Sequence, residues 1–397
     1  MHKSFHVFSF FMSNSSILDD AGKVSALDPQ GMLKIVEEST RFMKWCIDTL
    51  ETKDETRIEG TIKDFIKDKD IRGVFIVGMG GSAISGDVAH DWLKDCVKIP
   101  ILVIRGYELP AYIDGDWVGI FLSYSGNTEE TLSTFASAKS RGISGIGITS
   151  GGLLEQFLGK TGEPCIKVPG GYQPRAAMLY LFTSLAITLA HFNLCDTDTL
   201  LEEIRESLDV LMELSKQHAM DVPMKDNEMK QVASILHGST ILVYGFDHLI
   251  SVARRFKGQV NENGKNPSYY DFFPELNHNE TVGWEIEKEL ASHFSCVFLR
   301  DPTSETEPVR VRIEYTQELI AKKASAVIEL HAKGTSRLAK MLSLIYMADF
   351  ISVYLALLNG KDPTPVNYIQ GLKDVLKNKV NMQDRIQTKL NEILKEK

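Results

Sequence analysis

Short apolar segments alternate with longer amphipathic ones through the first half of the chain. The apolar segments are rich in β-branched residues and end in Gly, Pro, Asn or Ser, a pattern that predicts strands. The predicted strands cover residues 73–78, 99–104, 117–122, 143–149 and 165–168. Between them, apolar residues return every three to four positions, as on one face of a helix. This alternation predicts an α/β fold with a mostly parallel sheet flanked by helices on both faces.

The second half repeats this plan more loosely. Its predicted strands cover residues 240–244, 296–300 and 326–330, and its clearest helix covers residues 249–260. We therefore expect two related α/β domains. The expected division is an N-terminal extension at 1–27, a first domain at 28–195, a polar connecting helix at 196–227, and a second domain with the C-terminal helices at 228–397.

Two stretches are apolar enough to resemble membrane spans. Residues 176–192 are shorter than the roughly 20 residues that a span needs. Residues 341–358 contain Asp349 and follow Arg337 and Lys340. Both patterns favour helices buried in a core, so no membrane-spanning segment is predicted.

Composition narrows the classes of function. The 44 Lys and Arg against 53 Asp and Glu give a formal charge of −9, which repels nucleic acid and acidic membranes, so a small anion needs a local site. The five cysteines form no C-x-x-C pair and have no His at metal-ligand spacing. This usage favours reduced cysteines, a cytoplasmic location and no structural metal. We also expect Met12 to be the natural first residue, with residues 1–11 outside the natural protein.

The turn Gly78-Met-Gly-Gly-Ser-Ala83 is the first candidate for chemistry. It follows a predicted strand and fits G-x-G-x-x-A, a weak form of the dinucleotide fingerprint. The next strand ends in Arg105 instead of the acidic residue that holds ribose hydroxyls, although an Arg suits a 2′-phosphate. The turn suits any phosphate or sugar hydroxyl equally well, and a purely structural tight turn is also open.

The segment Ser123-Tyr-Ser-Gly-Asn-Thr128 is the second candidate. Three hydroxyls and several backbone N–H groups gather there at the start of a predicted helix, whose partial positive charge favours an anion. The structural alternative is a capping box, formed by Thr128 with Thr131 or by Asn127 with Glu130. Such a box needs only one of the three hydroxyls.

Arg175 is the third candidate. It stands at the start of the apolar helix predicted at 176–192, where a cation opposes the helix dipole and an anionic partner would resolve the conflict. A surface Arg that only snorkels is the alternative. Because these turns follow the carboxyl ends of parallel strands, we expect them to converge. The second half holds no counterpart of GMGGS or SYSGNTEE, so we expect one small-anion pocket per chain.

Five motifs together resemble the bifunctional phosphoglucose/phosphomannose isomerases of the phosphoglucose isomerase superfamily. They are VGMGGSAISGD, SYSGNTEETL, GYQPRAA, the NENGK of residues 261–265 and the PELNHNE of residues 274–280. SYSGNTEET alone marks any sugar isomerase (SIS) domain, whereas QPRAA with NENGK and PELNHNE is more specific. The resemblance runs from about Asp19 to Leu376. It implies two SIS-type domains in a homodimer that interconverts glucose 6-phosphate, and mannose 6-phosphate, with fructose 6-phosphate without metal or cofactor.

The resemblance also assigns substrate-binding residues. The hydroxyl-rich turn would hold the phosphate of the sugar, the Gly-rich turn would line the site, and the Arg would stabilise the charge of an enediolate intermediate. These residues are Ser123, Ser125, Thr128, Gly81, Ser82 and Arg175.

Three further residues are implied as catalytic. Glu262 of NENGK would move a proton between C2 and C1, and His278 of PELNHNE, donated by the other subunit, would open the sugar ring. Lys373 matches the C-terminal active-site lysine of the family, although a lysine in a Lys-rich helical tail is readily a solvated residue. Isomerisation needs a base, a second acid/base and fixed positive charge near an oxyanion, which Glu262, His278 and Arg175 supply.

Glu262 and His278 also have structural explanations that involve no catalysis. Glu262 alone is a surface carboxylate, and His278 alone is a loop histidine satisfied by Asn277 or Asn279. A non-catalytic sugar-phosphate sensor needs the hydroxyl turn but neither residue, and an NADP-dependent oxidoreductase rests on the Gly-rich turn alone. The segment at 267–274, with two prolines and four aromatics, predicts an ordered projecting loop that could carry His278 to a neighbouring subunit.

Overall fold

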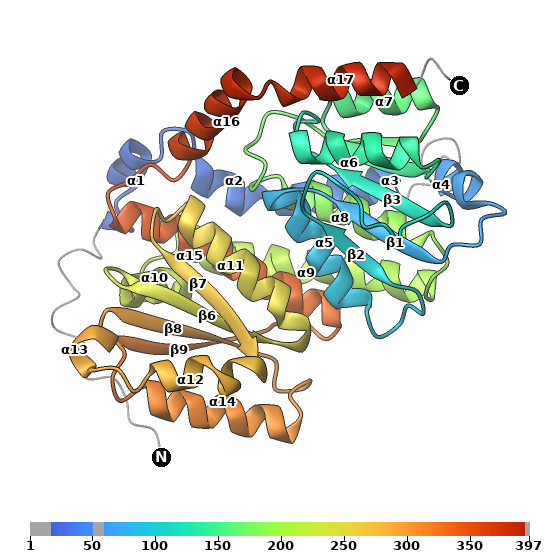
Figure 1. Cartoon of the computed structure of the whole chain (residues 1–397). Coiled ribbons are helices and arrows are strands. Elements are labelled where there is room, and N and C mark those ends of the chain that lie inside the picture. The colour runs from blue at the N-terminus through green and yellow to red at the C-terminus, as the bar shows by residue number, and fades with distance from the viewer. Residues whose placement is uncertain (1–16, 51–58, 394–397) are drawn as a thin grey trace. The chain divides into compact units, whose positions relative to one another are not determined.

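The chain folds into two compact units, each built on a parallel sheet (Figure 1). The structure is a computed structural model that describes residues 17–50 and 59–393. Unit 1 holds the described residues up to Glu38 together with Glu206–Pro365, and unit 2 holds Ser39–Arg205 and the described residues from Val366 onward. The expectation about Met12 concerns residues outside the described ranges.

The sheet of unit 2 contains the five strands predicted in the first half of the chain. They are β1 (Gly73–Val77), β2 (Ile101–Ile104), β3 (Trp117–Leu122), β4 (Gly145–Thr149) and β5 (Cys165–Lys167). All neighbouring pairs are parallel, in the order β2-β1-β3-β4-β5. The chain moves outward from β1 to β2 and then returns to β3 on the other side of β1. The carboxyl ends of β1 and β3 therefore form the switch point at which ligands bind in such sheets.

Helices flank this sheet, and most of them bury apolar residues in the core of the unit. They are α3 (Thr40–Leu50), α4 (Glu59–Ile66), α5 (Gly80–Leu93), α6 (Glu129–Ser140), α7 (Gly152–Thr161), α8 (Met178–Ala190), α16 (Asn367–Lys379) and α17 (Met382–Ile393). Every residue of α8 is buried, and α8 packs against α3 and α5. The prediction of a core helix at 176–192 is therefore confirmed.

The sheet of unit 1 has four parallel strands in the order β7-β6-β8-β9. They are β6 (Thr240–Phe246), β7 (Ser268–Phe273), β8 (Phe294–Arg300) and β9 (Ala326–His331). The path from β6 outward to β7 and back to β8 repeats the switch point of unit 2. The expectation of a second, related parallel sheet is confirmed.

The strand β7 replaces the projecting loop expected at 267–274. Ser268–Phe273 pairs with β6 along its whole length, from Ile241 opposite Ser268 to Phe246 opposite Phe273. The two prolines lie just outside the strand, at its two ends, and the strand is at the edge of the sheet, where proline costs little. The prediction was wrong because the prolines were given more weight than the strand-forming aromatics between them.

The helices of unit 1 surround its sheet. They are α1 (Ala21–Leu27), α2 (Met32–Glu38), α10 (Glu228–Leu236), α11 (Ile250–Glu262), α12 (Glu280–Gly283), α13 (Lys288–Ala291), α14 (Glu307–Ile320) and α15 (Arg337–Leu358), with the short 3₁₀ helices η2 (Asp247–Leu249) and η3 (Glu275–His278). Among the described helices, α15 alone is long and apolar enough to cross a membrane, but 89% of its most apolar window is buried inside the protein. It is the core helix predicted at 341–358.

The units differ from the expected domain boundaries at both ends of the chain. The N-terminal helix α2 belongs to unit 1, where it packs on α15 and the hydroxyl of Tyr346 donates to the Val36 carbonyl at 2.9 Å. The C-terminal helix α17 belongs to unit 2, where Ile386 and Leu390 are buried in one cluster with Phe135 of α6. The polar helix α9 (Thr197–His218) runs from unit 2 into unit 1.

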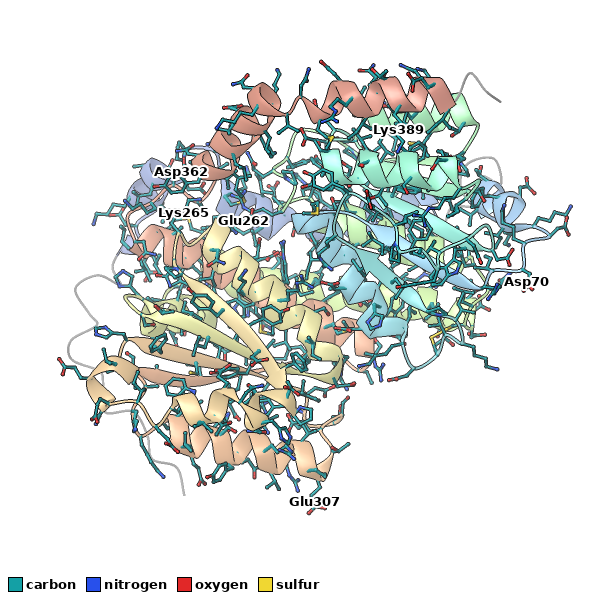
Figure 2. All side chains as sticks on the ribbon, in the orientation of Figure 1. Asp70, Glu262, Lys265, Glu307, Asp362 and Lys389 are labelled. Atoms are coloured by element: carbon teal, nitrogen blue, oxygen red, sulfur yellow. A yellow bond between two sulfur atoms is a disulfide. The ribbon has the colours of Figure 1, made fainter. Side chains whose placement is uncertain are left out.

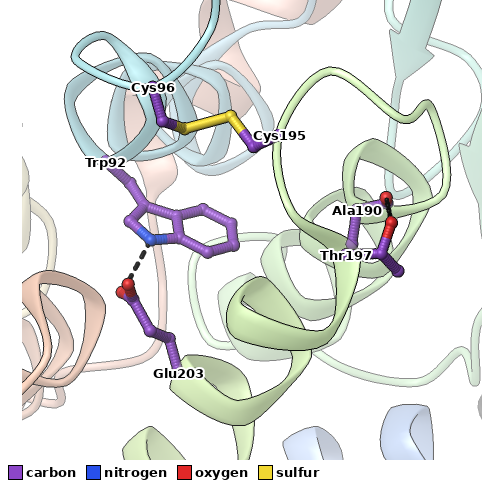
Figure 3. Close-up of a disulfide and its surroundings, with 6 residues drawn as sticks. All are labelled: Trp92, Cys96, Ala190, Cys195, Thr197 and Glu203. Atoms are coloured by element: carbon purple, nitrogen blue, oxygen red, sulfur yellow. Dashed lines mark hydrogen bonds between the residues drawn. A yellow bond between two sulfur atoms is a disulfide. The ribbon is translucent and has the colours of Figure 1, made fainter.

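A disulfide joins Cys96 to Cys195 in unit 2, so the expectation that all five cysteines are reduced was wrong (Figure 3). The two Cα atoms lie 5.9 Å apart although the residues are 99 positions apart in sequence. Cys96 follows α5 and Cys195 follows α8, so the bond links the C-terminal ends of two helices that pack together. Sequence spacing carries no information about such a long-range contact.

Candidate functional site

The Gly-rich and hydroxyl-rich turns of unit 2 lie side by side at the switch point of the sheet. β1 and β3 pair in parallel up to Val77 opposite Phe121, and the two turns follow at once. Gly80, with a φ of +51°, starts α5, and a side chain on Gly81 would clash with Pro174, because its Cβ would lie 2.9 Å from the Pro174 carbonyl oxygen. Glycine therefore lets the segment before α8 pack directly on the start of α5.

The packing of the segment before α8 on the start of α5 brings Arg175 next to the Gly-rich turn. The Cα of Arg175 lies 3.1 Å from where a Cβ of Gly81 would be, and only 3% of the Arg175 residue is exposed. The alternative of a snorkelling surface Arg is therefore wrong. Ser82 is also buried, so the backbone of Arg175 and the Ser82 residue both lie at the N-terminal end of α5.

The hydroxyl of Thr128 does not cap α6. Thr128 occupies the N-cap position, but its side chain makes no capping hydrogen bond and lies 2.9 Å from the Ser123 hydroxyl instead. The Thr131 hydroxyl, which the capping-box alternative would use, is buried without a hydrogen-bond partner among the described residues. The backbone N–H groups at the start of α6 thus keep their capacity to bind an external anion.

Glycine holds the same turn against the loop that follows β4. Gly126 has a φ of +69°, and a Cβ there would lie 1.7 Å from the Gly151 carbonyl oxygen, so only glycine fits. The N–H of Leu154 donates to the Gly126 carbonyl at 3.0 Å. Ser125, at the outer side of the turn, stays exposed and its hydroxyl accepts from the Asn127 N–H.

Tyr124 connects three loops. Its carbonyl accepts from the Ser150 hydroxyl at 2.6 Å, and its own hydroxyl donates to the Pro169 carbonyl at 2.9 Å and accepts from the Tyr172 N–H at 3.1 Å. The loop that begins at Pro169 carries Arg175. The predicted convergence of the turns is confirmed, although sequence reasoning did not identify Tyr124 as their link.

A residue of the C-terminal helix also contacts the hydroxyl-rich turn. The side-chain amide of Gln383, on α17, donates to the Asn127 carbonyl at 2.8 Å. The amphipathic pattern of α17 indicates a helix but not the surface it covers, so sequence reasoning missed this contact.

Arg105 is engaged within the protein, which weakens the nucleotide alternative. Its guanidinium pairs with the Asp87 carboxylate and donates to the Ala83 carbonyl at 3.3 Å. Arg105, which the sequence analysis considered as a partner for a 2′-phosphate, thus stabilises the first turns of α5.

Glu262 is the last residue of α11 in unit 1, and Figure 2 shows it beside Lys265. The Lys265 ammonium donates to the carbonyls of Glu262, Pro363 and Pro365. The side-chain amide of the buried Asn263 donates to the Ser352 hydroxyl at 3.0 Å. Most of NENGK therefore fixes the end of α11, and Glu262 is held half-buried on that rigid end.

His278 is exposed at the end of η3, between two anchored neighbours. The Asn277 amide donates to the Thr316 hydroxyl at 2.9 Å, and the Glu280 carboxylate accepts from the Tyr244 hydroxyl. Burial raises the pKa of Glu280 to about 7; the bond from Tyr244 opposes this rise, and the hydrogen bond and negative charge of Asp271 add to it. Contacts on both sides of His278 thus hold the loop in place, while His278 itself stays exposed.

Glu262 and His278 flank opposite ends of the edge strand β7. The end of α11 precedes the amino end of β7, and η3 follows its carboxyl end. The strand advances ~3.3 Å per residue, so the six residues of β7 that stand between Glu262 and His278 span roughly 17 Å. Groups that act on one sugar must lie within hydrogen-bond reach of it. The structure therefore does not bring these two residues together within unit 1.

Lys373 lies exposed on α16 of unit 2, a helix with no buried residue. No three His, Cys, Asp or Glu side chains among residues 17–50 and 59–393 are grouped to hold a metal ion. The structure thus brings together the turns of unit 2 that were predicted to bind the sugar phosphate, while the binding roles of these residues and the catalytic roles of Glu262, His278 and Lys373 stay predictions.

Comparison with known sequences finds the same family that the five motifs resemble. Residues 225–376 match the family model of the bacterial phospho-glucose isomerase C-terminal SIS domain. The chain is 42% identical over 316 residues to the bifunctional phosphoglucose/phosphomannose isomerase of Caldicellulosiruptor bescii, covering 79% of this chain and 91% of that protein. It is 36% identical over 317 residues to the protein of the same name in Aquifex aeolicus, covering 79% and 94%.

Solved structures agree in fold. The C-terminal domain of glucosamine-fructose-6-phosphate aminotransferase from Francisella tularensis is similar with a TM-score of 0.64 and 16% identity, covering 84% of this chain and 98% of that domain. At this identity the likeness shows the fold alone.

Proposed function

The chain belongs to the family of bifunctional phosphoglucose/phosphomannose isomerases, and we propose that it interconverts glucose 6-phosphate and mannose 6-phosphate with fructose 6-phosphate. The observation that carries the proposal is the 42% identity over 316 residues. The matched C-terminal family model includes Glu262, His278 and Lys373. A sensor that only binds sugar phosphates would need none of these three.

In this proposal unit 2 binds the phosphate of the sugar. The hydroxyls of Ser123, Ser125 and Thr128 and the free N–H groups at the start of α6 are hydrogen-bond donors for a dianion, and the helix dipole adds to its binding. The turn at Gly81 and Ser82 lines the other side of the site.

The proposed chemistry passes through an enediolate. Glu262 removes the proton from C2 of the open-chain aldose and returns it to C1, while His278 exchanges the proton of the ring oxygen during opening. The Arg175 guanidinium stabilises the oxyanion that develops as the C2 proton leaves. The assignment of Lys373 to the site rests on the family pattern alone.

We propose further that His278 acts in the site of a second copy of the chain. The separation of roughly 17 Å along β7 supports this, because one chain cannot present both residues of unit 1 to a single sugar. A two-fold dimer would give two composite sites, each with Glu262 from one chain and His278 from the other.

Mixed dimers test the composite site. Glu262→Ala and His278→Ala homodimers should each be nearly inactive, whereas heterodimers formed by refolding the two together have one site that regains both residues. With equal mixing about half the dimers are mixed, so activity should return to roughly a quarter of the wild-type value. No recovery, although differentially tagged heterodimers are isolated, would place His278 in its own chain or outside catalysis.

A coupled assay tests the activity itself. Purified protein should convert both aldose 6-phosphates to fructose 6-phosphate. Glu262→Gln, which keeps the shape of the side chain but removes the base, should lower both rates by at least ~10²-fold. Binding of sugar phosphates with no turnover of either substrate would favour the sensor instead.

A further inference from the structure

The loop between β8 and α14 of unit 1 has the same length as the hydroxyl-rich turn of unit 2. β8 ends at Arg300 and α14 begins at Glu307, which leaves the six residues 301–306; β3 ends at Leu122 and α6 begins at Glu129, which leaves 123–128. The backbone turns are also alike. The N–H of Ser304 donates to the Asp301 carbonyl at 2.9 Å, as the N–H of Gly126 donates to the Ser123 carbonyl at 3.0 Å.

The turn after β6 likewise repeats the Gly-rich turn after β1. Asp247, the first residue after β6, and Gly80, at the start of α5, both have a positive φ, of +46° and +51°. β6 and β8 flank the switch point of the unit 1 sheet as β1 and β3 flank that of unit 2. Unit 1 therefore repeats in its backbone the two turns that are predicted to form an anion-binding cradle in unit 2, although its sequence holds no counterpart of GMGGS or SYSGNTEE.

The cradle of unit 1 contains a carboxylate of its own. Asp301 stands at the position of Ser123, is 1% exposed, and turns its carboxylate back into the loop. It accepts hydrogen bonds from the Thr303 hydroxyl at 2.7 Å, the Ser304 hydroxyl at 2.5 Å and the Thr303 N–H at 3.2 Å. These donors are of the types that a bound anion would use.

A histidine and a lysine side chain lie close to the same carboxylate. His248 takes the place of Gly81, is fully buried, and its Nε2 lies 3.3 Å from one Asp301 oxygen without a well-aligned hydrogen bond to any described residue. The Lys340 ammonium, from the first turns of α15, lies 3.3 Å from the other oxygen. Lys340 thus stands near the start of the apolar core helix, as Arg175 does before α8.

We propose that unit 1 holds a second anion-binding site that Asp301 fills as a built-in ligand, and that removal of this carboxylate opens the site to a small anion such as formate. The filled site gives a reason why each chain would bind one sugar phosphate although both units have the cradle. The proposal does not depend on the isomerase activity.

The charge state of Asp301 is consistent with a bound anion. Burial raises the pKa of Asp301, but interactions with His248, Ser304 and Thr303 and the charge of Lys340 outweigh burial and hold the pKa well below its ordinary value. The carboxylate is therefore charged at neutral pH.

Formate rescue of Asp301→Ala tests the proposal. The variant should melt well below wild type in sodium chloride, and sodium formate at equal ionic strength should return its melting temperature toward the wild-type value in a saturable way. Asp301→Asn is the matched control, because its amide fills the space and leaves no room for formate. In Asp301→Ala/Lys340→Met the response should be lost, which locates the anion in this cradle.

Two results would overturn the proposal. One is a formate response of folded Asp301→Ala no larger than those of wild type and Asp301→Asn. If Asp301→Ala does not fold in chloride, its refolding yield in formate replaces the melting temperature, and an equal yield in both salts is the contrary outcome. The other uses wild-type protein: if calorimetry finds two inorganic phosphates bound per chain, the cradle of unit 1 is open and not filled.

Discussion

Removing the disulfide should weaken unit 2 strongly. The bond between Cys96 and Cys195 closes a loop of 99 residues, and a cross-link over ~100 residues lowers the free energy of the folded relative to the unfolded chain by about 4.7 kcal/mol in the chain-entropy account. For a domain of 150–250 residues ~1 kcal/mol corresponds to ~2–4 °C, so Cys96→Ser/Cys195→Ser should lower the melting temperature of unit 2 by roughly 9–19 °C.

The position of the bond predicts an effect on substrate binding as well. It joins the C-terminal ends of α5 and α8, while the start of α5 carries Ser82 and the segment before α8 carries Arg175. Looser packing of the two helices should spread the distance between these groups. We expect the KM for sugar phosphates to rise several-fold in the double Ser variant, with a smaller change in kcat.

Tryptophan fluorescence during urea unfolding is a suitable assay, because Trp92 packs beside the disulfide with its indole N–H on Glu203, as Figure 3 shows. Cys165→Ser, which alters a half-buried thiol that forms no bond, should change the free energy of unfolding by less than ~1 kcal/mol. Thiol titration of denatured, unreduced wild type should find three free thiols, and five after reduction.

Two outcomes would refute this reasoning. A loss below ~1 kcal/mol in the double Ser variant, when titration shows three thiols in wild type, would mean that the bond does not restrain the unfolded chain as the entropy account requires. Five free thiols in unreduced wild type would mean that the bond does not form.

Three further predictions follow from other parts of the molecule. Ser125→Ala/Thr128→Ala should raise the KM for sugar phosphates at least tenfold, since each hydrogen bond to a charged group contributes ~1.5–3 kcal/mol, while the melting temperature stays near the wild-type value; an unchanged KM would locate the phosphate elsewhere. Because the folded state keeps a proton on Glu280 up to pH of about 7 whereas an unfolded Glu loses it near 4.5, the free energy of unfolding should fall as pH rises between these values, and Glu280→Gln should flatten this dependence in pH-resolved urea titrations; equal slopes for the two proteins would contradict it. Leu390→Ala on α17 should cost ~2–5 kcal/mol because Leu390 is fully buried, whereas Leu372→Ala on the exposed α16 should cost less than ~0.5 kcal/mol; similar losses would mean that α17 does not pack as described.

Local sequence patterns were sufficient to predict that the candidate binding residues of unit 2 lie close together. The apolar segments that become β1 and β3 end where glycine and hydroxyl residues begin, and parallel strands present their carboxyl ends at one edge. Ser123, Ser125, Thr128, Gly81 and Arg175 could therefore be placed together from sequence. Whether the Thr128 hydroxyl caps the helix or is available to an anion could not be predicted from sequence, because both a cap and an anion site need a hydroxyl at that position.

Contacts between distant segments were beyond sequence patterns. Nothing in the spacing of Cys96 and Cys195 predicts that they meet, and the apolar face of α17 does not identify α6 as its partner. The strand β7 was missed because its flanking prolines resemble loop residues, although an edge strand tolerates them.

The cradle of unit 1 was missed for a different reason. Its loop has the length and backbone turn of the unit 2 loop, but Asp301 replaces a hydroxyl and His248 replaces a glycine. A search by residue type finds no likeness there, because what the two loops share is backbone conformation.

Isotope exchange tests the central claim most directly. Wild-type protein incubated with fructose 6-phosphate in deuterium oxide should produce glucose 6-phosphate and mannose 6-phosphate, both with deuterium at C2, as followed by proton NMR, because the base exchanges its proton with solvent before returning it. Glu262→Gln at equal concentration should slow both products and the exchange by the same factor, at least ~10². Exchange at the wild-type rate in Glu262→Gln, or the absence of both aldoses with wild type, would contradict the account.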